Sequence, residues 1–285
     1  GSFTVAADAS GYSITLSATC VGLAVVPDGV TNLGYGSFSD STGLTSIEIP
    51  ASVASIDSRA FDNATALTRI TVDSASTNYS TIDGVLFTKS LATEELFKYP
   101  AAKGTSSYDV PTTVKKIGAF AFYKEKSLTS ITIPSGVEVI GESSFENSAL
   151  EDVTFAADSS LVQIDNWGFG ETQIETIDIP VGVISIGDYA FYAATSLTMI
   201  TIPASVTTIG DNAFEGASSL EVVAFASGSR LTSIGDYAFY NTTALTTIAI
   251  PASVVSIGDN AFAIPFTDPP TPSSLASVTF ASGSQ

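Results

Sequence analysis

The chain has 285 residues, 45% of them hydrophobic, with one cysteine and no histidine. Its 29 acidic residues outnumber its 10 basic residues, giving a net charge of −19. This charge argues against nucleic acid and against direct binding to anionic membranes, because both need clustered lysine and arginine. Without histidine, the chain lacks the side chain most used for acid-base catalysis and metal binding near neutral pH.

The first 20 residues precede any repeat, and we expect them to form an N-terminal cap segment. Cys20 is alone, so it can form neither an internal disulfide nor a cysteine-rich zinc site. We expect it to be a small buried apolar side chain. No apolar run reaches the roughly 20 residues that a membrane span needs.

From residue 21 to residue 285 one unit recurs with a period near 23 residues. Each unit ends in a phenylalanine, and successive intervals are 23, 61, 23, 24, 22, 23, 25 and 23 residues. A proline column has the same period and the same single gap. Such periodicity is typical of a solenoid, and the incomplete last unit indicates a piece of a longer array. The closing residues are Phe38, Phe61, Phe122, Phe145, Phe169, Phe191, Phe214, Phe239 and Phe262.

Each unit begins with a pattern of alternating apolar residues, as in "LTSITIP" from Leu128 to Pro134. Alternation with β-branched residues predicts a short half-buried strand, which proline ends. The following "IGDNAF", Ile209 to Phe214, predicts a glycine turn, an aspartate N-cap and a short helical turn with inward Ala and Phe. We therefore predict a right-handed β/α superhelix, with strands on one face, helical turns on the other, and one β-hairpin insert.

The segments "LTSITIPSGVEVIG" and "IGDYAFYAATSLTMITIPASVTTIGDNAF" resemble BspA-type leucine-rich repeats, also described as the Treponema pallidum class. The resemblance covers nearly the whole chain. It implies a secreted or surface-anchored adhesion or interaction protein. Where the family often has a cysteine after the closing Phe, this chain has none, so no cysteine column reinforces the core. The positions are Ala64, Glu125, Ala194, Ala217 and Thr242.

An insert at residues 73–109 interrupts the repeat and reads as two strands, Val85 to Thr88 and Glu95 to Tyr99. It concentrates aromatic residues and scarce lysines, so we predict a ligand-binding site there; the alternative is a surface excursion packed by its own aromatics. A Pro-rich loop at 263–275 is a second departure with the same two readings. The candidate ligand-binding residues are Lys89, Lys98, Lys103, Tyr79, Phe97 and Tyr99.

An aspartate occupies one position of four consecutive units: Asp188, Asp211, Asp236 and Asp259. We predict that each caps its own helical turn, since a carboxylate there satisfies free amides. A calcium ladder is the alternative, because stacked coils lie roughly 5 Å apart. Earlier units place mixed residues at this position, which favours the caps, and we expect no metal site.

Outward residues of the strands form two mostly hydroxylated columns, and leucine-rich repeats commonly bind partners on this face. The candidates are Thr71, Thr132, Thr154, Asp178 and Thr201. β-Propensity and solvation explain the threonines equally simply. An ice-binding surface is a third reading, although charged and apolar residues interrupt the regularity.

No convergent cluster of unlike polar groups occurs in the aligned columns, so we expect a protein without enzymatic activity and without a cofactor. The predicted role is recognition of a host or extracellular protein or glycan by a surface or secreted protein. A passive spacer that projects another domain is the alternative.

Overall fold

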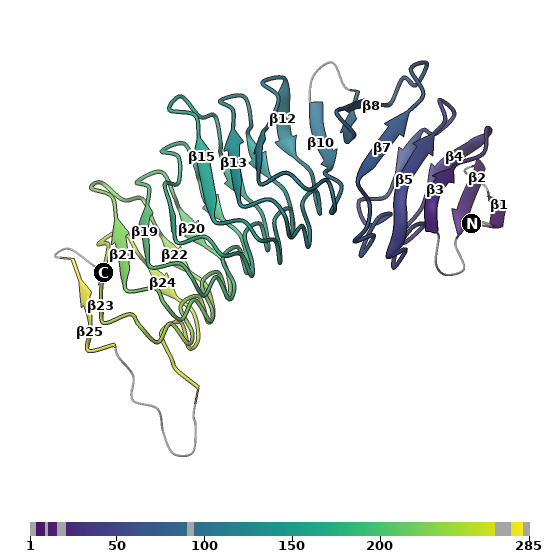
Figure 1. Ribbon diagram of the computed structural model, residues 1–285. Helices are drawn as coiled ribbons and strands as arrows, with labels where there is room; N and C mark the ends of the chain where they lie inside the picture. Colours follow the sequence, from purple (N-terminus) through teal and green to yellow (C-terminus); the bar gives the residue numbers. More distant parts are fainter. Residues whose placement is uncertain (1–3, 9–10, 16–20, 90–93, 266–274, 282–285) are drawn as a thin grey trace.

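The computed structural model describes residues 4–8, 11–15, 21–89, 94–265 and 275–281. These residues form stacked coils with strands along two faces, as Figure 1 shows from the N-terminus (purple) to the C-terminus (yellow). No helix occurs in these ranges, and therefore none that could cross a membrane. Cys20 and most of the Pro-rich loop lie outside the described residues.

One face carries the first strand of each unit, and we call it the strand face. Its strands pair in parallel. Equivalent residues of successive units lie side by side, as in Thr132 opposite Thr154. Outward and inward residues alternate, so every second side chain enters the core. The strands are β3 (Val21–Val25), β5 (Gly43–Ile49), β7 (Arg69–Val72), β11 (Ser107–Asp109), β13 (Ser130–Ile133), β15 (Asp152–Phe155), β17 (Thr176–Ile177), β19 (Met199–Ile202), β21 (Val222–Phe225), β23 (Thr247–Ile250) and β25 (Ser277–Phe280).

A second run of strands forms the other face, and in the regular units each of these strands follows the proline. It forms a ten-stranded sheet in the order β24-β22-β20-β18-β16-β14-β12-β10-β9-β8 and a four-stranded sheet in the order β1-β2-β4-β6. The strands are β1 (Thr4–Asp8), β2 (Gly11–Thr15), β4 (Val30–Leu33), β6 (Ser55–Ile56), β8 (Tyr79–Ile82), β9 (Val85–Thr88), β10 (Glu94–Lys98), β12 (Val114–Ile117), β14 (Val139–Ile140), β16 (Gln163–Ile164), β18 (Ser185–Ile186), β20 (Thr208–Ile209), β22 (Ser233–Ile234) and β24 (Ser256–Ile257).

The predicted helical turns are wrong: the segment from the aspartate to the closing Phe is a series of tight turns. Tyr189 and Ala193 have positive φ angles of 57° and 47°, which a helix does not allow. Alternate backbone amides donate hydrogen bonds to the next coil. The Phe191 amide donates to the Ala213 carbonyl of the next coil at 2.7 Å, whereas the Tyr192 amide donates to the Tyr189 carbonyl of its own coil at 3.0 Å. Amides used between coils cannot also form helical hydrogen bonds.

The aspartate column links coils and does not cap helices, so the cap prediction is also wrong. Oδ1 of Asp188 accepts the Asp211 amide at 2.9 Å, Asp211 accepts the Asp236 amide at 2.8 Å, and Asp236 accepts the Asp259 amide at 2.7 Å. The close approach of successive coils at this position requires the glycine that precedes each aspartate. A Cβ on Gly235 would lie 2.4 Å from Asp211 Oδ1. We call this arrangement the aspartate ladder.

The closing phenylalanines form stacks inside the coils, as their period predicts. From Phe122 to Phe262 adjacent rings lie 4.9 to 5.5 Å apart and are nearly parallel. Phe38 and Phe61 form a separate pair at 5.7 Å. The buried residues divide into two clusters at the insert.

The strands of the insert separate these two clusters. The predicted hairpin is confirmed by the antiparallel pairing of β9 with β10, and β8 adds a third antiparallel strand. In β9, Leu86 packs in the N-terminal cluster, while Val85 and Phe87 pack in the C-terminal cluster. All three are fully buried, so this strand has a core on each side. Figure 1 shows the insert between β7 and β12.

Candidate functional site

Lys98, a predicted ligand-binding residue, is buried with 4% of its surface exposed. Its Nζ donates to the Phe120 carbonyl at 2.7 Å. Burial lowers the pKa of Lys98 to about 8, and the nearby Asp62 carboxylate offsets this only in part. Lys98 is therefore not available as a surface charge, because it ends β10 within the insert and bonds to the following coil.

The other predicted insert residues are also largely engaged. Lys103 forms an ion pair with Asp83 at 2.7 Å, with 10% of the Lys103 side chain exposed. Lys89 is exposed, and its Nζ donates to the Ser76 carbonyl at 2.7 Å. The insert therefore presents one exposed lysine of the three.

The aromatic residues of the insert pack in the core. Tyr79 is buried, and its hydroxyl accepts the Ile56 amide at 2.9 Å, which closes the edge of β6. Phe97 packs edge-on against Tyr79. Tyr99 is buried and stacks on Phe122 at 4.9 Å, in the place where a closing Phe would lie. The alternative, an insert packed by its own aromatics, describes these rings better, although Tyr79 belongs to the N-terminal cluster and Tyr99 to the C-terminal cluster.

The strand-face candidates lie where the pattern predicts. Thr132, Thr154, Asp178 and Thr201 are exposed on the strand face. Thr71 is half-buried, and its hydroxyl donates to the Ile47 carbonyl at 3.1 Å. The structure thus brings these residues onto one accessible surface.

The hydroxyl columns are interrupted on this surface by an apolar pair. Met199 and Val222 are register neighbours and are exposed at 48% and 46%. This pair breaks the regular hydroxyl array that an ice-binding surface would need, and it gives the C-terminal half of the strand face an apolar contact area.

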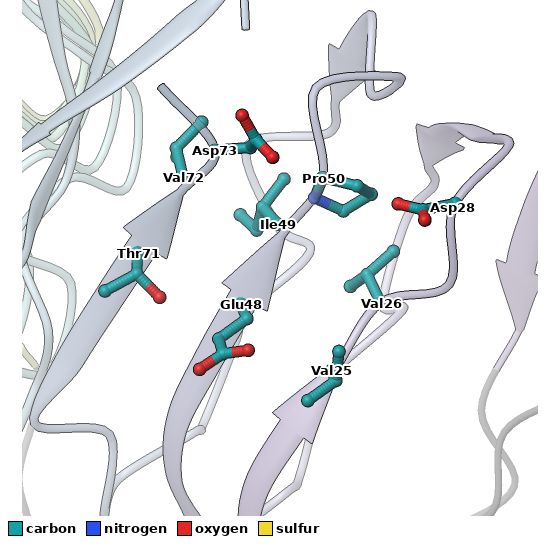
Figure 2. A pocket seen from close by; sticks show the side chains of 9 residues that line it. All are labelled: Val25, Val26, Asp28, Glu48, Ile49, Pro50, Thr71, Val72 and Asp73. Atoms are coloured by element: carbon teal, nitrogen blue, oxygen red, sulfur yellow. The ribbon is translucent and has the colours of Figure 1, made fainter. Parts of the chain in front are cut away.

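At its N-terminal end the strand face is hollowed. A hollow of about 310 Å³ lies over the ends of β3, β5 and β7, and Figure 2 shows the side chains around it. Val25, Glu48 and Thr71 are register neighbours on the three strands, and Asp28, Pro50 and Asp73 follow the strand ends. The lining residues are Val25, Val26, Asp28, Glu48, Ile49, Pro50, Thr71, Val72 and Asp73.

The hollow combines an apolar floor with carboxylates. Val26 and Ile49 are each 2% exposed and belong to the core. Asp28, Glu48 and Asp73 bring three carboxyl groups to the lining, and Asp73 Oδ1 accepts the Ala75 amide at 2.8 Å. Nowhere in the described part of the chain do three or more acidic or cysteine side chains gather closely enough to hold a metal ion. The arrangement suits contact with a positively charged group carried on an apolar stem.

The sequence analysis missed this hollow, apart from Thr71. The available signal was the repeated acidic residue at strand ends, with Asp28 after Pro27 and Asp73 after Val72. These acids lie at different positions within their units, so alignment by column did not bring them together. Parallel stacking of β3, β5 and β7 does.

A family model for the BspA type leucine rich repeat region matches this chain in six copies, over residues 19–108, 93–221 and 154–266. The chain belongs to the BspA-type leucine-rich repeat family. This agrees with the stacked coils and the aligned strand register. No curated protein sequence matches the chain significantly.

Solved structures of bacterial leucine-rich repeat proteins resemble this BspA-type chain. One from Eubacterium ventriosum is 27% identical with a TM-score of 0.77, covering 92% of this chain and 68% of that one. A leucine rich cell surface protein from Faecalibacterium prausnitzii is 31% identical with a TM-score of 0.58, covering 74% and 60%. The pneumococcal vaccine antigen PcpA, 20% identical with a TM-score of 0.59 over 91% and 68%, shares the fold.

Proposed function

We propose that this BspA-type chain is a non-enzymatic recognition module that binds another macromolecule through its strand face at a cell surface. The observation that carries the proposal is the hollow over β3, β5 and β7, with its apolar floor and three carboxyl groups. A cell-surface location is supported by the similarity to the Faecalibacterium prausnitzii protein, which is a leucine rich cell surface protein.

A protein fits this surface better than an acidic glycan. Asp28, Glu48 and Asp73 repel anions, and the net charge of −19 extends that repulsion over the whole chain. A lysine or arginine side chain can place its charge near the carboxylates and its aliphatic stem on Val25, which is 49% exposed. The exposed pair of Met199 and Val222 supplies a second contact area on the same face.

The test is a binding screen of the purified chain against extracellular proteins and glycans, followed by charge reversal in the hollow. Glu48→Lys is expected to weaken binding at least about tenfold, because it replaces an attractive carboxylate by a like charge. Glu138→Lys, an equal charge change at an exposed position following β13, is the matched control.

Equal effects of the two substitutions would show that binding depends on net charge alone, and would contradict the proposal that the hollow is the binding site. If the folded chain bound nothing in the screen, the passive spacer would be the better description.

A further inference from the structure

A second hollow, of about 390 Å³, lies beside β7, where the insert meets the strand face. The sheet of β3, β5 and β7 ends at β7, and the next sheet of the strand face begins at β11. The volume is within the roughly 300–1,000 Å³ of sites for small molecules. Six of the eight residues that line it have polar side chains, so we call it the polar hollow. They are Thr68, Arg69, Thr71, Thr81, Asp83 and Lys103.

Backbone hydrogen bonds fix the walls of the polar hollow. The Ile70 amide donates to the Gly84 carbonyl at 2.9 Å, which holds the turn between β8 and β9 against β7. Gly84 has a φ of 79°, and a Cβ there would lie 3.0 Å from Arg69 Cβ, so this turn needs glycine. The Ala102 amide donates to the Leu67 carbonyl at 2.8 Å, which holds the loop before β11 near the start of β7. The polar hollow is therefore formed before any ligand binds.

The lining carries two cations and one carboxylate, a net charge of +1. Lys103, with 10% of its side chain exposed, forms an ion pair with Asp83 at 2.7 Å. The hydrogen bond and the charge of Lys103 lower the pKa of Asp83, and the charge of Arg69 adds to this. Arg69 is exposed and belongs to neither of the two ion pairs that the described residues form. The polar hollow therefore favours a ligand with a single negative charge, which Arg69 is available to bind.

Three other polar groups of the hollow are placed to accept hydrogen bonds. The Thr68 hydroxyl donates to the Thr45 carbonyl at 2.8 Å, and the Thr71 hydroxyl donates to the Ile47 carbonyl at 3.1 Å. A hydroxyl that donates to the backbone keeps its lone pairs for a ligand. Asp83 uses Oδ2 for Lys103, and its side chain is 84% exposed, so Oδ1 is available as an acceptor. A ligand that satisfies these groups must donate hydrogen bonds from neutral groups.

A sugar ring with one carboxylate meets both conditions, because it combines a single negative charge with several hydroxyl donors. Arg69 can bind the carboxylate through two parallel N–H groups. A zwitterion would bring an ammonium group near Lys103, and a polyanion would place further charges against Asp83. Salt screens the more distant carboxylates of this acidic chain over about 8 Å, so the charges of the lining dominate within the hollow.

We propose that the polar hollow binds a carboxylated sugar, whose carboxylate pairs with Arg69 and whose ring hydroxyls donate to Asp83 and to the threonine oxygens. A terminal uronic acid and a terminal sialic acid share this chemistry. The site goes beyond the protein-binding surface proposed over β3, β5 and β7. Either site can fail without the other, because the two hollows share Thr71 alone.

The test is isothermal titration calorimetry of the intact chain with methyl β-glucuronide, methyl α-sialoside, methyl β-glucoside and sodium acetate. At least one of the two carboxylated sugars is expected to bind about tenfold more tightly than the glucoside, which lacks the carboxylate, and than acetate, which lacks the hydroxyls. The tighter of the two identifies the source of the sugar. Binding of neither, or equally tight binding of acetate, would overturn the proposal.

Two arginine variants locate the carboxylate. Arg69→Gln is expected to weaken binding of the carboxylated sugar about tenfold, because it removes the charge that pairs with the carboxylate. Arg230→Gln makes the same charge change at another exposed arginine and is expected to leave binding unchanged. Circular dichroism confirms the fold of each variant. Equal losses in the two would show that net charge alone attracts the sugar, which would overturn the proposal.

Asp83→Asn tests the hydroxyl contacts. Asp83 has a φ of 48°, which asparagine adopts readily, so the turn is expected to persist. The variant removes a negative charge, so acetate is expected to bind no more weakly than before. Because a carboxylate accepts hydroxyl hydrogen bonds more strongly than a neutral amide, the ratio of sugar affinity to acetate affinity is expected to fall several-fold. An unchanged ratio would show that the ring hydroxyls do not contact Asp83 and would overturn the proposal.

Discussion

Asp188 and Asp211 lie on successive coils, and Oδ1 of Asp188 accepts the Asp211 backbone amide at 2.9 Å. Side chains here extend the backbone ladder between coils at an exposed edge. Each aspartate therefore stabilises the interface between two repeats, and in a solenoid that interface largely determines stability.

Replacing Asp211 by alanine removes the acceptor of the Asp236 amide. The free energy of unfolding is expected to fall by about 1 kcal/mol, the usual net value of one hydrogen bond. Asp211→Asn retains an acceptor oxygen and is expected to lose less than half of that amount. Denaturant titration of both variants measures the difference, and an equal loss in the two would contradict the ladder.

Calcium is expected to leave the melting temperature unchanged, because Asp188, Asp211 and Asp236 each use an oxygen to accept an amide. A ligand that binds only the folded state raises the melting temperature by mass action. Adding millimolar calcium to chelator-treated protein in a thermal scan is the measurement. A reproducible upward shift would restore the calcium interpretation.

Gly235→Ala is expected to destabilise the chain by about 1–3 kcal/mol, the usual cost of forcing atoms into a packed position. The new Cβ would lie 2.4 Å from Asp211 Oδ1 and 2.6 Å from the Asp211 amide nitrogen. Gly34→Ala is the control, since its Cβ would have 3.7 Å to the nearest heavy atom. Urea unfolding of both variants checks the prediction, and equal stabilities would show that the coils can separate without cost.

The stacked core was predictable because a period near 23 residues places every closing Phe at one position of its coil. The turns were not. The sequence of glycine, aspartate and an apolar pair is compatible with two structures. One is a capped helical turn, and the other is the observed turn, in which Asp188 accepts the Asp211 amide of the next coil. Only the neighbouring coil distinguishes these structures, and a single repeat contains no information about its neighbour.

The insert was misjudged for a related reason. Its lysines and aromatics were predicted to bind a ligand because they interrupt the repeat. The run Val85, Leu86 and Phe87 was the contrary signal, since a strand with three successive apolar residues is typical of burial on both faces. Lys98 gave no signal of burial, because its position depends on the Phe120 carbonyl of another coil.

Because Lys98 is buried, we predict that the free energy of unfolding varies with pH in the alkaline range. Its pKa is about 8 in the folded chain and is ordinarily 10.5. Above pH 8 the unfolded chain binds more protons at this residue than the folded chain, so the free energy of unfolding rises with pH. We expect a gain of roughly 2 kcal/mol between pH 7.5 and 9.5. Above pH 10 the raised pKa values of Tyr79 and Tyr99 act in the opposite direction.

Lys98→Met is the control for this dependence. It removes the titrating group while keeping an unbranched apolar stem, so its unfolding free energy should be nearly flat over the same pH range. The slope is compared and not the absolute stability, because the variant also loses the hydrogen bond to Phe120. Parallel slopes in the two proteins would show that Lys98 is not the titrating group.

Leu86 and Phe87 are adjacent in β9 but belong to different cores, which predicts that the two halves of the chain can be destabilised separately. Leu86→Ala creates a cavity in the N-terminal cluster, and Phe87→Ala creates one in the C-terminal cluster. Each is expected to cost about 2–5 kcal/mol locally. In a solenoid, repeats contact only their neighbours, so a local loss need not spread beyond the strand that divides the cores. Hydrogen exchange should therefore accelerate mainly in residues 21–72 for Leu86→Ala and mainly in residues 107–262 for Phe87→Ala. The same exchange pattern in both variants would show that β9 couples the two cores into one cooperative unit.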